Sequence, residues 1–439
     1  MSAIDTRDMH RQVWKLAWPM IISNISVPLL GLVDTAVIGH LPDPRYLGAV
    51  AIGASLFSIL FWGFGFLRMG TTGLTAQALG SDNHQALKLL LAQSLILAAA
   101  IGLLLILFQQ PLISLGLRLM DPSPAVLAEA RIYCNIRIFS APAVLANYAL
   151  LGWFLGLQNS RIPLALLISA NLINILLDLL FVLGLEMTVD GVAWASVCAD
   201  YGALTLGLWL TVNKFKELPA RFDSAPLLNW RNYSELLRTN RYLFVRTLTL
   251  LFTFCFFTAQ SAKLGDQALA ANAVLLNFLL LISHSLDGFA HAIEALCGKF
   301  RGAKDDPRFY AVCRAATLWS LATALLLTLF FVFFGQMLIR LLTDIPTVIS
   351  YAVEYLPWLI LMPLIGVWSY LLDGIFIGAN WFRPMQNCML LSVLLIFLPS
   401  WYLSQPLGNH GLWLSLSLFL LARAATAGGY FFFRTRPRQ

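Results

Sequence analysis

Long apolar stretches separated by short polar connections run along the whole chain. A stretch of about 20 apolar residues is long enough to cross the hydrocarbon core of a bilayer as a helix. Twelve such stretches occur, at residues 13–39, 47–78, 86–108, 126–156, 161–184, 190–213, 240–263, 268–298, 308–335, 346–378, 384–404 and 409–433. The pattern therefore predicts an all-α integral membrane protein with twelve transmembrane helices.

The composition indicates that lipid, rather than water, is the solvent of most of the chain. Of 439 residues, 59% are hydrophobic and only 12% are charged, and the mean hydropathy is +0.76. A soluble protein of this length would need far more charge on its surface. The amino end is polar from Met1 to Arg11, and the first apolar run is too long for the core of a cleavable signal. We therefore expect a spanning helix there.

The longest polar connection divides the chain near its middle. It runs from Lys214 to about Asn240 and contains "KFKELPARFDSAPLLNWRNYSELLR". We expect an amino-terminal lobe of helices 1–6 at residues 1–213, a cytoplasmic linker at 214–239 and a carboxyl-terminal lobe of helices 7–12 at 240–439.

The two halves resemble each other at a nearly constant offset of 222 residues. "LGAVAIGASLF" (47–57) corresponds to "LAANAVLLNFL" (269–279), and "GLQNSRIP" (156–163) corresponds to "GANWFRPM" (378–385). A shared register over several helix pairs indicates an internal duplication. Because each half has an even number of helices, the repeats are parallel and form two pseudo-symmetric six-helix bundles around a cleft, which would give alternating access by rocking.

The distribution of Lys and Arg predicts the orientation, because cytoplasmic loops carry an excess of these residues. With both termini in the cytoplasm, the termini and even-numbered loops hold 21 of the 29 basic residues, the odd-numbered loops hold six, and Arg68 and Arg246 lie inside spans. We therefore expect a multi-pass protein of the bacterial cytoplasmic (inner) membrane with both ends inside. The net charge of +7 then reflects topology, and we expect no nucleic-acid partner.

Six carboxylates lie inside the apolar spans. An ionised carboxylate that faces lipid costs about 3 kcal/mol on insertion scales, so six of them would exceed the net stability of a typical domain. These side chains must therefore face protein or water, and we expect some of them to be protonated. They are Asp34, Asp178 and Asp200 in the first half and Asp287, Glu294 and Asp373 in the second.

The three acids of the first half form a candidate proton-coupling group. Asp34 in helix 1 and Asp178 in helix 5 lie at matching distances from the outer ends of their spans, and Asp200 in helix 6 lies somewhat deeper. Asn171, Asn174 and Asp178 share one helix face at i, i+3 and i+7. Their amides can hydrogen-bond either form of a carboxyl group, which suits an acid that exists in both forms. The alternative is a static hydrogen-bonded core.

Pro28 and Gly31 predict a hinge in helix 1, one to two turns before Asp34. Proline removes one backbone hydrogen bond and clashes with the carbonyl four residues earlier, which belongs to Asn24, so the helix bends there. A hinge beside a titratable group couples protonation to helix shape. A fixed kink without switching is the alternative, because prolines are ordinary in membrane helices.

Helix 8 carries a second polar group in the stretch "HSLDGFAHAIEAL". His284, Asp287, His291 and Glu294 follow one another at i, i+3, i+7 and i+10 and share one face. One straight helix cannot wrap four ligands around an ion, so we favour an ion-pair and proton-handling stripe over a metal site or a static polar face. We expect Asp373 of helix 10 to join this group.

Arg68 and Arg246 are candidate counter-charges for these acids, with snorkelling to the membrane surface as the alternative. The six cysteines form no CxxC pair and nearly all fall in apolar runs, so we expect packing residues without a disulfide or a metal. A minority of the aromatic residues, which make up 13% of the chain, could hold an organic cation through their ring faces. We expect no bound metal or cofactor.

These residues, in this order, resemble the multidrug and toxic compound extrusion (MATE) family, and within it the DinF-like branch. The likeness covers nearly the whole chain, from "LAWPMIISNISVPLLGLVDTAVIGHL" (16–41) through "NLINILLDLLFVLGL" (171–185) and "LDGFAHAIEA" (286–295) to "GVWSYLLDGIFIGA" (366–379). The helix 1 segment is the most specific. The resemblance implies a V-shaped pair of six-helix lobes that exports cationic or amphipathic compounds in exchange for protons or sodium.

The resemblance also implies roles for single residues. Asp34 matches the coupling carboxylate of DinF-like members, and Asn174, Asp178 and Pro28 match their helix 5 amide and acid and their helix 1 proline. Relatives that use sodium through the second lobe place acids in helices 7 and 10. Asp373 matches the helix 10 position, but helix 7, "RYLFVRTLTLLFTFCFFTAQSAKLG" (241–265), has no acid. That departure favours protons that act in the first lobe.

We therefore predict a secondary active multidrug efflux antiporter, not an enzyme, that is driven by a proton gradient. It would work as a monomer on small organic cations or amphipathic drugs, and a sodium-coupled antiporter is the main alternative. A lipid-linked precursor flippase would need several cations for a pyrophosphate, whereas the balance in the membrane is six acids to two arginines. A sugar-type facilitator is disfavoured because "GSDNHQALK" (80–88) is not its basic, glycine-rich loop, and no catalytic cluster indicates a membrane enzyme.

Overall fold

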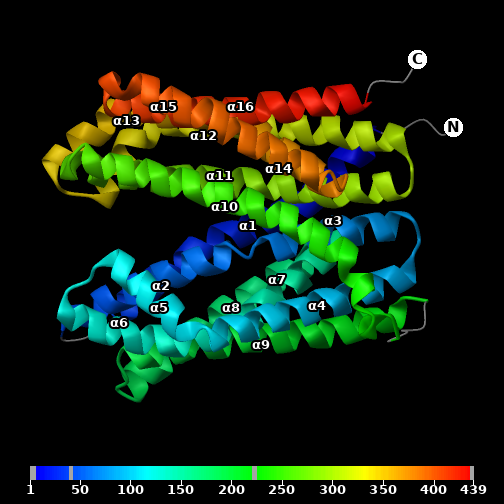
Figure 1. Cartoon of the computed structure of the whole chain (residues 1–439), viewed down its shortest axis with the longest axis horizontal. Coiled ribbons are helices and arrows are strands. Elements are labelled where there is room, and N and C mark those ends of the chain that lie inside the picture. Colours follow the sequence, from blue (N-terminus) through cyan, green and yellow to red (C-terminus); the bar gives the residue numbers. More distant parts are fainter. Residues whose placement is uncertain (1–5, 39–42, 220–224, 436–439) are drawn as a thin grey trace. The chain divides into compact units, whose positions relative to one another are not determined.

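The computed structural model describes residues 6–38, 43–219 and 225–435, with the backbone alone at positions 6, 25, 27–38, 44, 228 and 230. Within these residues the chain is helical and contains no strand (Figure 1). Helices long and apolar enough to cross a membrane number eleven over the described part: 45–80, 84–107, 124–156, 161–184, 189–217, 231–263, 266–302, 306–342, 346–378, 382–407 and 409–435. Together with the first helix, α1 (Thr6–Ile38), they match the twelve predicted spans, and most bounds agree within four residues.

The individual elements are shorter than the spans, because several spans are interrupted. In the described residues the first half contains α1 (Thr6–Ile38), α2 (Pro44–Trp62), α3 (Phe66–Gly80), α4 (His84–Leu107), α5 (Gln109–Met120), α6 (Pro124–Arg137), η1 (Ile138–Ser140), α7 (Ala141–Gly156), α8 (Arg161–Asp178), η2 (Leu179–Gly184) and α9 (Val189–Glu217). The second half contains η3 (Ala225–Leu228), η4 (Trp230–Tyr233), α10 (Ser234–Lys263), α11 (Asp266–Gly302), α12 (Asp306–Leu342), α13 (Pro346–Gly378), α14 (Phe382–Leu391), η5 (Ser392–Phe397), α15 (Leu398–Ser404), η6 (Gln405–Leu407) and α16 (Asn409–Thr435).

The interruptions have local causes. The break between α6 and α7 comes just before Pro142, which has no N–H group and clashes with the carbonyl of Ile138. The break between α2 and α3 contains Gly63 and Gly65, which weaken a helix. The fifth span of each half continues instead as a π-helical turn, η2 or η5. Such turns are often found at functional sites.

The contacts divide the chain into two compact units. The amino-terminal unit is Ile22–Asn240, and the carboxyl-terminal unit is Arg241–Gln439 together with Met1–Ile21. The start of α1 therefore packs with the second half of the sequence: the Trp14 ring lies edge-on to Phe289 of α11 and to Trp319 of α12, with ring centroids 5.4 and 5.1 Å apart. The predicted division of the chain into functional lobes and a linker stays a prediction.

In the amino-terminal unit, α7 packs against α3 and α4, and α9 packs against α6 and α8 (Figure 1). Leu91, Leu150, Trp153 and Phe154 form a buried cluster between these helices. Part of the predicted linker is docked on this unit: the Gln93 side chain of α4 donates to a carbonyl oxygen of η4 at 3.2 Å. Lys88, five residues earlier in α4, donates to the Leu218 carbonyl oxygen just after α9 at 3.3 Å.

In the carboxyl-terminal unit, α13 runs alongside α11, α12 and α16 (Figure 1). Its core is a large apolar cluster that includes the fully buried rings of Phe257, Phe331 and Trp413. A polar contact lies inside it, where Asn272 and Asn409 exchange hydrogen bonds of 2.7 and 3.1 Å and the Trp413 indole donates to Asn272 at 2.9 Å. These groups satisfy one another and fix α11 against α16.

Both units contain the same close helix contact, at the offset of 222 residues. A Cβ atom on Gly152 of α7 would lie 2.4 Å from the Arg68 carbonyl oxygen of α3, and a Cβ atom on Gly374 of α13 would lie 2.5 Å from the Ala290 carbonyl oxygen of α11. One turn later, Gly156 and Gly378 make the equivalent contacts with residues 72 and 294. Each pair is a GxxxG motif, which lets two backbones approach closely in a membrane.

Candidate functional site

The predicted residues of helix 1 lie on α1, whose backbone is helical up to Ile38. The side chains of Pro28, Gly31 and Asp34 fall outside the described residues. The expected hinge and the coupling carboxylate therefore stay predictions at this stage.

The polar face of α8 lies between neighbouring helices, and two of its members make interhelical hydrogen bonds. The Asn171 amide donates to the Ser26 hydroxyl of α1 at 3.3 Å and lies 3.5 Å from the Ser26 carbonyl oxygen. The Asn174 amide is 2% exposed and donates to the Ser196 hydroxyl of α9 at 3.3 Å. The face predicted from i, i+3, i+7 spacing thus fastens α8 to α1 on one side and to α9 on the other.

Asp178 completes this face as the last residue of α8, and it is fully buried. The π-helical turn η2 begins at the next residue, Leu179. A π-turn disturbs the regular i→i−4 ladder, so the carboxylate lies where the backbone changes its hydrogen-bond pattern. Residues Ser26 and Ser196, which contact the amides of this face, were not singled out by the sequence, since a serine in an apolar span has no distinctive spacing.

Asp200 was expected to belong to the group of Asp34 and Asp178, but its carboxylate forms an ion pair with Arg137. Its Oδ2 atom lies 2.6 Å from Nη1 of Arg137 on α6, and the two side chains are only 20% and 16% exposed. The Asn147 amide donates to the Asp200 carbonyl oxygen at 3.0 Å, and Arg137 also donates to the Ser140 hydroxyl at the break between α6 and α7. The fixed guanidinium stabilises the charge of Asp200 and ties α9 to the interrupted span.

Asp373 is held in the same way in the carboxyl-terminal unit, but by two arginines. Arg423 of α16 donates to Oδ2 of Asp373 at 2.7 Å, and Arg246 of α10 donates to the same oxygen. The expectation that Arg246 is a counter-charge is confirmed. The side chains of Arg246, Arg423 and Asp373 are 7%, 6% and 18% exposed, so the ion triad is inside the helix bundle.

These pairs correct the count of intramembrane charges. Only Arg68 and Arg246 were counted as intramembrane arginines from the sequence, yet Arg137 and Arg423 also fall within the predicted spans 126–156 and 409–433, and each lies near the middle of its observed span. A span tolerates an arginine when a carboxylate on a neighbouring helix compensates it. The balance of six acids to two arginines was therefore wrong, and it no longer argues against a flippase. One arginine is removed from each side of the membrane, so the predicted orientation is unaffected.

The polar stripe of α11 is present, with local contacts. The Ser283 hydroxyl donates to Asp287 at 3.4 Å, and Nδ1 of His291 lies 3.6 Å from Oε2 of Glu294, which is 1% exposed. Asp373 belongs to the ion triad, and the expectation that it joins the stripe stays a prediction. Among the residues that the structure describes, no three His, Cys, Asp or Glu side chains are placed to hold a metal ion. The role of the stripe, which includes His284, stays a prediction.

The six cysteines are free thiols; Cys134, Cys297 and Cys313 are buried, whereas Cys198 and Cys255 are exposed. Two of them meet: the Sγ atoms of Cys297 on α11 and Cys313 on α12 are 3.5 Å apart, and both residues are buried. Sequence spacing did not indicate this contact, because the two residues lie on opposite sides of a loop.

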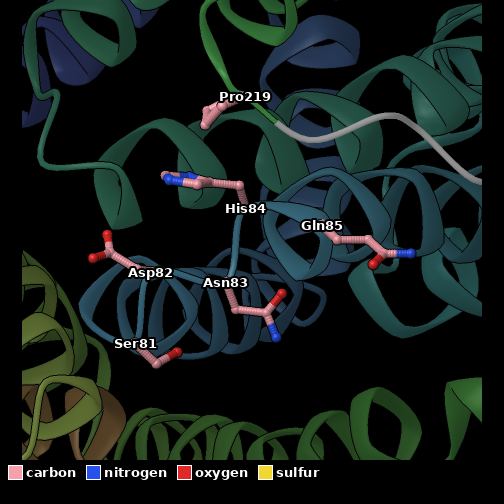
Figure 2. Close-up of a pocket in the computed structure, with 6 residues that line it drawn as sticks. All are labelled: Ser81, Asp82, Asn83, His84, Gln85 and Pro219. Atoms are coloured by element: carbon pink, nitrogen blue, oxygen red, sulfur yellow. The ribbon is translucent and has the colours of Figure 1, made fainter.

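An open pocket of about 440 Å³ lies elsewhere, at the connection between α3 and α4. It is lined by Ser81, Asp82, Asn83, His84, Gln85 and Pro219. Figure 2 shows these side chains pointing in different directions, and the side-chain Oδ1 atom of Asn83 caps α4 by accepting from the Ala86 N–H at 3.0 Å. None of the predicted site residues is among them. This pocket is a loop feature without convergent chemistry.

The comparisons with known proteins agree with the sequence resemblance. The model of the MatE family matches residues 19–180 and 243–403, once in each half. The DNA damage-inducible protein F of Escherichia coli (strain K12) is 46% identical over 419 residues, which cover 94% of this chain and 90% of that protein. The multidrug resistance protein NorM of Vibrio cholerae is 27% identical over 435 residues, which cover 94% and 93% of the two chains.

The solved structures agree on the fold. A mutant of the Vibrio cholerae MATE transporter VcmN has a TM-score of 0.86 with this chain at 20% sequence identity, and the match covers 98% of each chain. At that identity the likeness concerns the fold alone. Because the family match extends over most of the sequence and one relative is 46% identical, the chain belongs to the MatE family, the multidrug and toxic compound extrusion transporters, and it is a multi-pass membrane transporter rather than an enzyme.

Proposed function

We propose that this chain is a proton-driven exporter of cationic or amphipathic organic compounds, and that Asp34 and Asp178 carry the coupling protons. One relative over nearly the full length is named as a multidrug resistance protein, which supports the substrate class. In the proposed cycle, inward-moving protons neutralise this pair of acids, α1 bends at Pro28 and Gly31, and the bound compound leaves on the outer side. Asn171 and Asn174 position the pair.

The contact between Asn171 and Ser26 is the observation that carries the proposal. Spans 1 and 5 are both odd-numbered and therefore run in the same direction through the membrane. Asp34 lies eight residues beyond Ser26 and Asp178 lies seven residues beyond Asn171. At a rise of 1.5 Å per residue these steps are about 12 Å and about 10.5 Å, so the two positions lie at nearly the same depth.

The surroundings of Asp178 suit a group that gains and loses a proton. The residue is fully buried, and a buried ionised carboxylate is costly unless it is compensated. A second acid at the same depth makes it costly for both to be ionised together, so a shared proton is favoured. The neighbouring π-turn η2 is a point where the helix can change its hydrogen-bond pattern when the charge changes.

We favour protons over sodium because two other intramembrane acids, Asp200 and Asp373, are already paired with arginines. Asp200 is paired with Arg137, and Asp373 is paired with Arg246 and Arg423. Sodium needs several oxygen ligands around one carboxylate or more, and these two carboxylates already accept from guanidinium groups. The coupling ion is therefore assigned to the pair on α1 and α8, where a proton needs only the acids themselves.

The test is transport in proteoliposomes that carry a proton gradient or a sodium gradient, one at a time, with ethidium as the transported cation. We expect the proton gradient alone to drive ethidium movement. The variants Asp34→Asn and Asp178→Asn should lose this coupling while their purified yield and helicity stay unchanged. Asp82→Asn, at an exposed position in the loop between α3 and α4, is the matched control and should transport normally.

Two outcomes would remove the proposal. Undiminished proton-driven transport by Asp34→Asn would exclude the coupling role of this acid. Transport that responds only to sodium would show that sodium, not the proton, is the coupling ion.

We further propose the bacterial cytoplasmic membrane as the location, with both ends of a monomeric chain in the cytoplasm, on the basis of the Lys and Arg distribution. Reporter fusions at each end, which fluoresce only in the cytoplasm, test this orientation.

A further inference from the structure

Asp373 is a carboxylate inside a membrane span, five residues before the end of α13, that is held by cations of its own chain. Arg246 reaches it from α10 and Arg423 reaches it from α16, and both guanidinium groups donate to the same oxygen, Oδ2. Three spans of the carboxyl-terminal unit therefore converge on one carboxylate.

The arginines are fixed by their surroundings rather than extended towards the membrane surface. Their side chains are 7% and 6% exposed. The Arg423 guanidinium lies 5.4 Å from the centre of the Phe419 ring, one turn earlier on α16. Near the same level, the Ser369 hydroxyl of α13 donates to the Leu420 carbonyl oxygen at 2.8 Å, which fastens α13 to α16. Snorkelling would require these contacts to break.

This geometry prevents other cations from binding to the Asp373 carboxylate. A carboxylate buried in a transporter of cations would otherwise attract a positively charged ion or drug group. A cation that approaches Asp373 meets two fixed positive charges within contact distance of the same oxygen. In a medium of low dielectric constant, their repulsion exceeds the attraction of the single negative charge.

We infer that Arg246 and Arg423 are resident counter-ions that exclude free cations from Asp373, and that neutralising them turns this place into a binding site for a monovalent cation. The two arginines thereby determine which ions the carboxyl-terminal unit accepts. The inference concerns ion binding by this unit alone. It can fail while the proton coupling of α1 and α8 holds, and the reverse is also possible.

The amino-terminal unit contains a related ion pair on the corresponding spans. In both units an ion pair joins the fourth and sixth spans, but the acid is on the sixth span in one case, at Asp200, and on the fourth in the other, at Asp373. What the two units share is an Arg–Asp pair between these spans rather than the residue at a given position, and in the carboxyl-terminal unit Arg246 adds a second cation. That recurrence supports a role as internal compensation.

The test measures sodium binding directly. The wild-type protein, the double variant Arg246→Gln/Arg423→Gln and the triple variant that adds Asp373→Asn are purified in detergent and equilibrated with radioactive sodium. Mildly alkaline pH favours the ionised carboxylate. Glutamine keeps the length and a donor group but removes the charge. Arg314→Gln, an exposed arginine of α12, is the matched control.

We expect one sodium ion per chain on the double variant and none on the wild type, on Arg314→Gln or on the triple variant. Thermal unfolding in sodium chloride and in choline chloride should show the same pattern: only the double variant gains stability from sodium. A folded double variant that binds no sodium overturns the inference, and so does a wild-type protein that binds sodium through Asp373.

A second measurement applies if the double variant does not fold. The single variant Arg423→Gln and the wild type are treated in native membranes with a hydrophobic carbodiimide, which modifies carboxyl groups that are not held in ion pairs. Peptide mass spectrometry then locates the modified residues. Asp373 should be modified several-fold faster in Arg423→Gln, and sodium should protect it there. Equal rates in both proteins would show that the arginines do not close the carboxylate.

Discussion

The pair of Arg137 and Asp200 allows structural acids to be separated from coupling acids. The substitution Asp200→Asn keeps the size of the side chain and removes its charge, so Arg137 loses a partner that lies 2.6 Å away. We expect the free energy of unfolding to fall while proton-driven transport continues. Asp34→Asn and Asp178→Asn should behave in the opposite way, because their charges are needed in the cycle rather than in the fold.

The magnitude follows from the burial of the pair. Breaking a buried ion pair costs about 3–5 kcal/mol, because the remaining charge is left uncompensated. The side chains are 16% and 20% exposed, and Arg137 keeps the Ser140 hydroxyl as an acceptor. Some screening by water remains, so we expect about 2–3 kcal/mol. For a chain of this length 1 kcal/mol moves the unfolding midpoint by roughly 1–2 °C, which gives a fall of about 2–6 °C.

The assay is a double-mutant cycle on the purified protein, with thermal unfolding followed by intrinsic fluorescence. Arg137→Gln and Asp200→Asn should each destabilise, and the double variant should lose less than their sum. The exposed pair of Lys214 and Glu217, at 2.6 Å with 36% and 65% exposure, is the matched control. Its double substitution to glutamine should change stability by less than about 0.5 kcal/mol. An Asp200→Asn variant that unfolds like the wild type but no longer couples transport to protons would place Asp200 in the coupling group and refute this reasoning.

Three further predictions concern the packing. Gly378→Ala should destabilise by about 1–3 kcal/mol, because the new Cβ atom would lie 2.4 Å from a carbonyl oxygen of α11, whereas Gly429→Ala, with nothing within 4 Å, should be neutral or stabilising in the same unfolding assay. Copper phenanthroline should oxidise Cys297 and Cys313 to a disulfide, seen as a cross-linked peptide that Cys313→Ser abolishes; a peptide of unlinked thiols would contradict the 3.5 Å contact. Trp14→Ala should lower the unfolding midpoint by the equivalent of about 1–3 kcal/mol, and no change would show that the start of α1 does not pack on α11 and α12.

The spans were predictable from the sequence because the bilayer leaves the backbone few choices. A helix satisfies every peptide group internally, so apolar length alone defines it. The interruptions were not predictable in the same way. Proline is the clearest case. The elements α6 and α7 separate just before Pro142, yet α13 runs through Pro357 and Pro363 as one helix. Neighbouring groups decide whether a freed carbonyl is satisfied, and these groups are distant in sequence.

The polar face of α8 was predictable, and the arginines of the ion pairs were not. Three polar residues at i, i+3 and i+7 in an apolar run must share a face, and Asn174 and Asp178 are indeed buried. A single arginine in an apolar window carries no such periodic signal. Arg137 and Arg423 were therefore left out of the count of intramembrane charges, although both fall within predicted spans. Their acids come from other helices, so only the fold reveals that each charge has a partner.

The two halves keep their packing at fixed positions but place their buried charges differently, and the physics of packing and of ion pairs explains both facts. A Cβ atom on Gly152 or Gly374 would lie 2.4 or 2.5 Å from a carbonyl oxygen of the neighbouring helix, so any larger residue would push the two helices apart. An ion pair is less restricted: the cost of burying it depends on both charges together, so acid and base can change places without a net electrostatic change. Packing is therefore held at fixed positions while charge is free to diverge. This freedom allows one unit to hold the coupling acids of the proposed cycle and the other to bury Asp373 between two arginines, within a single fold.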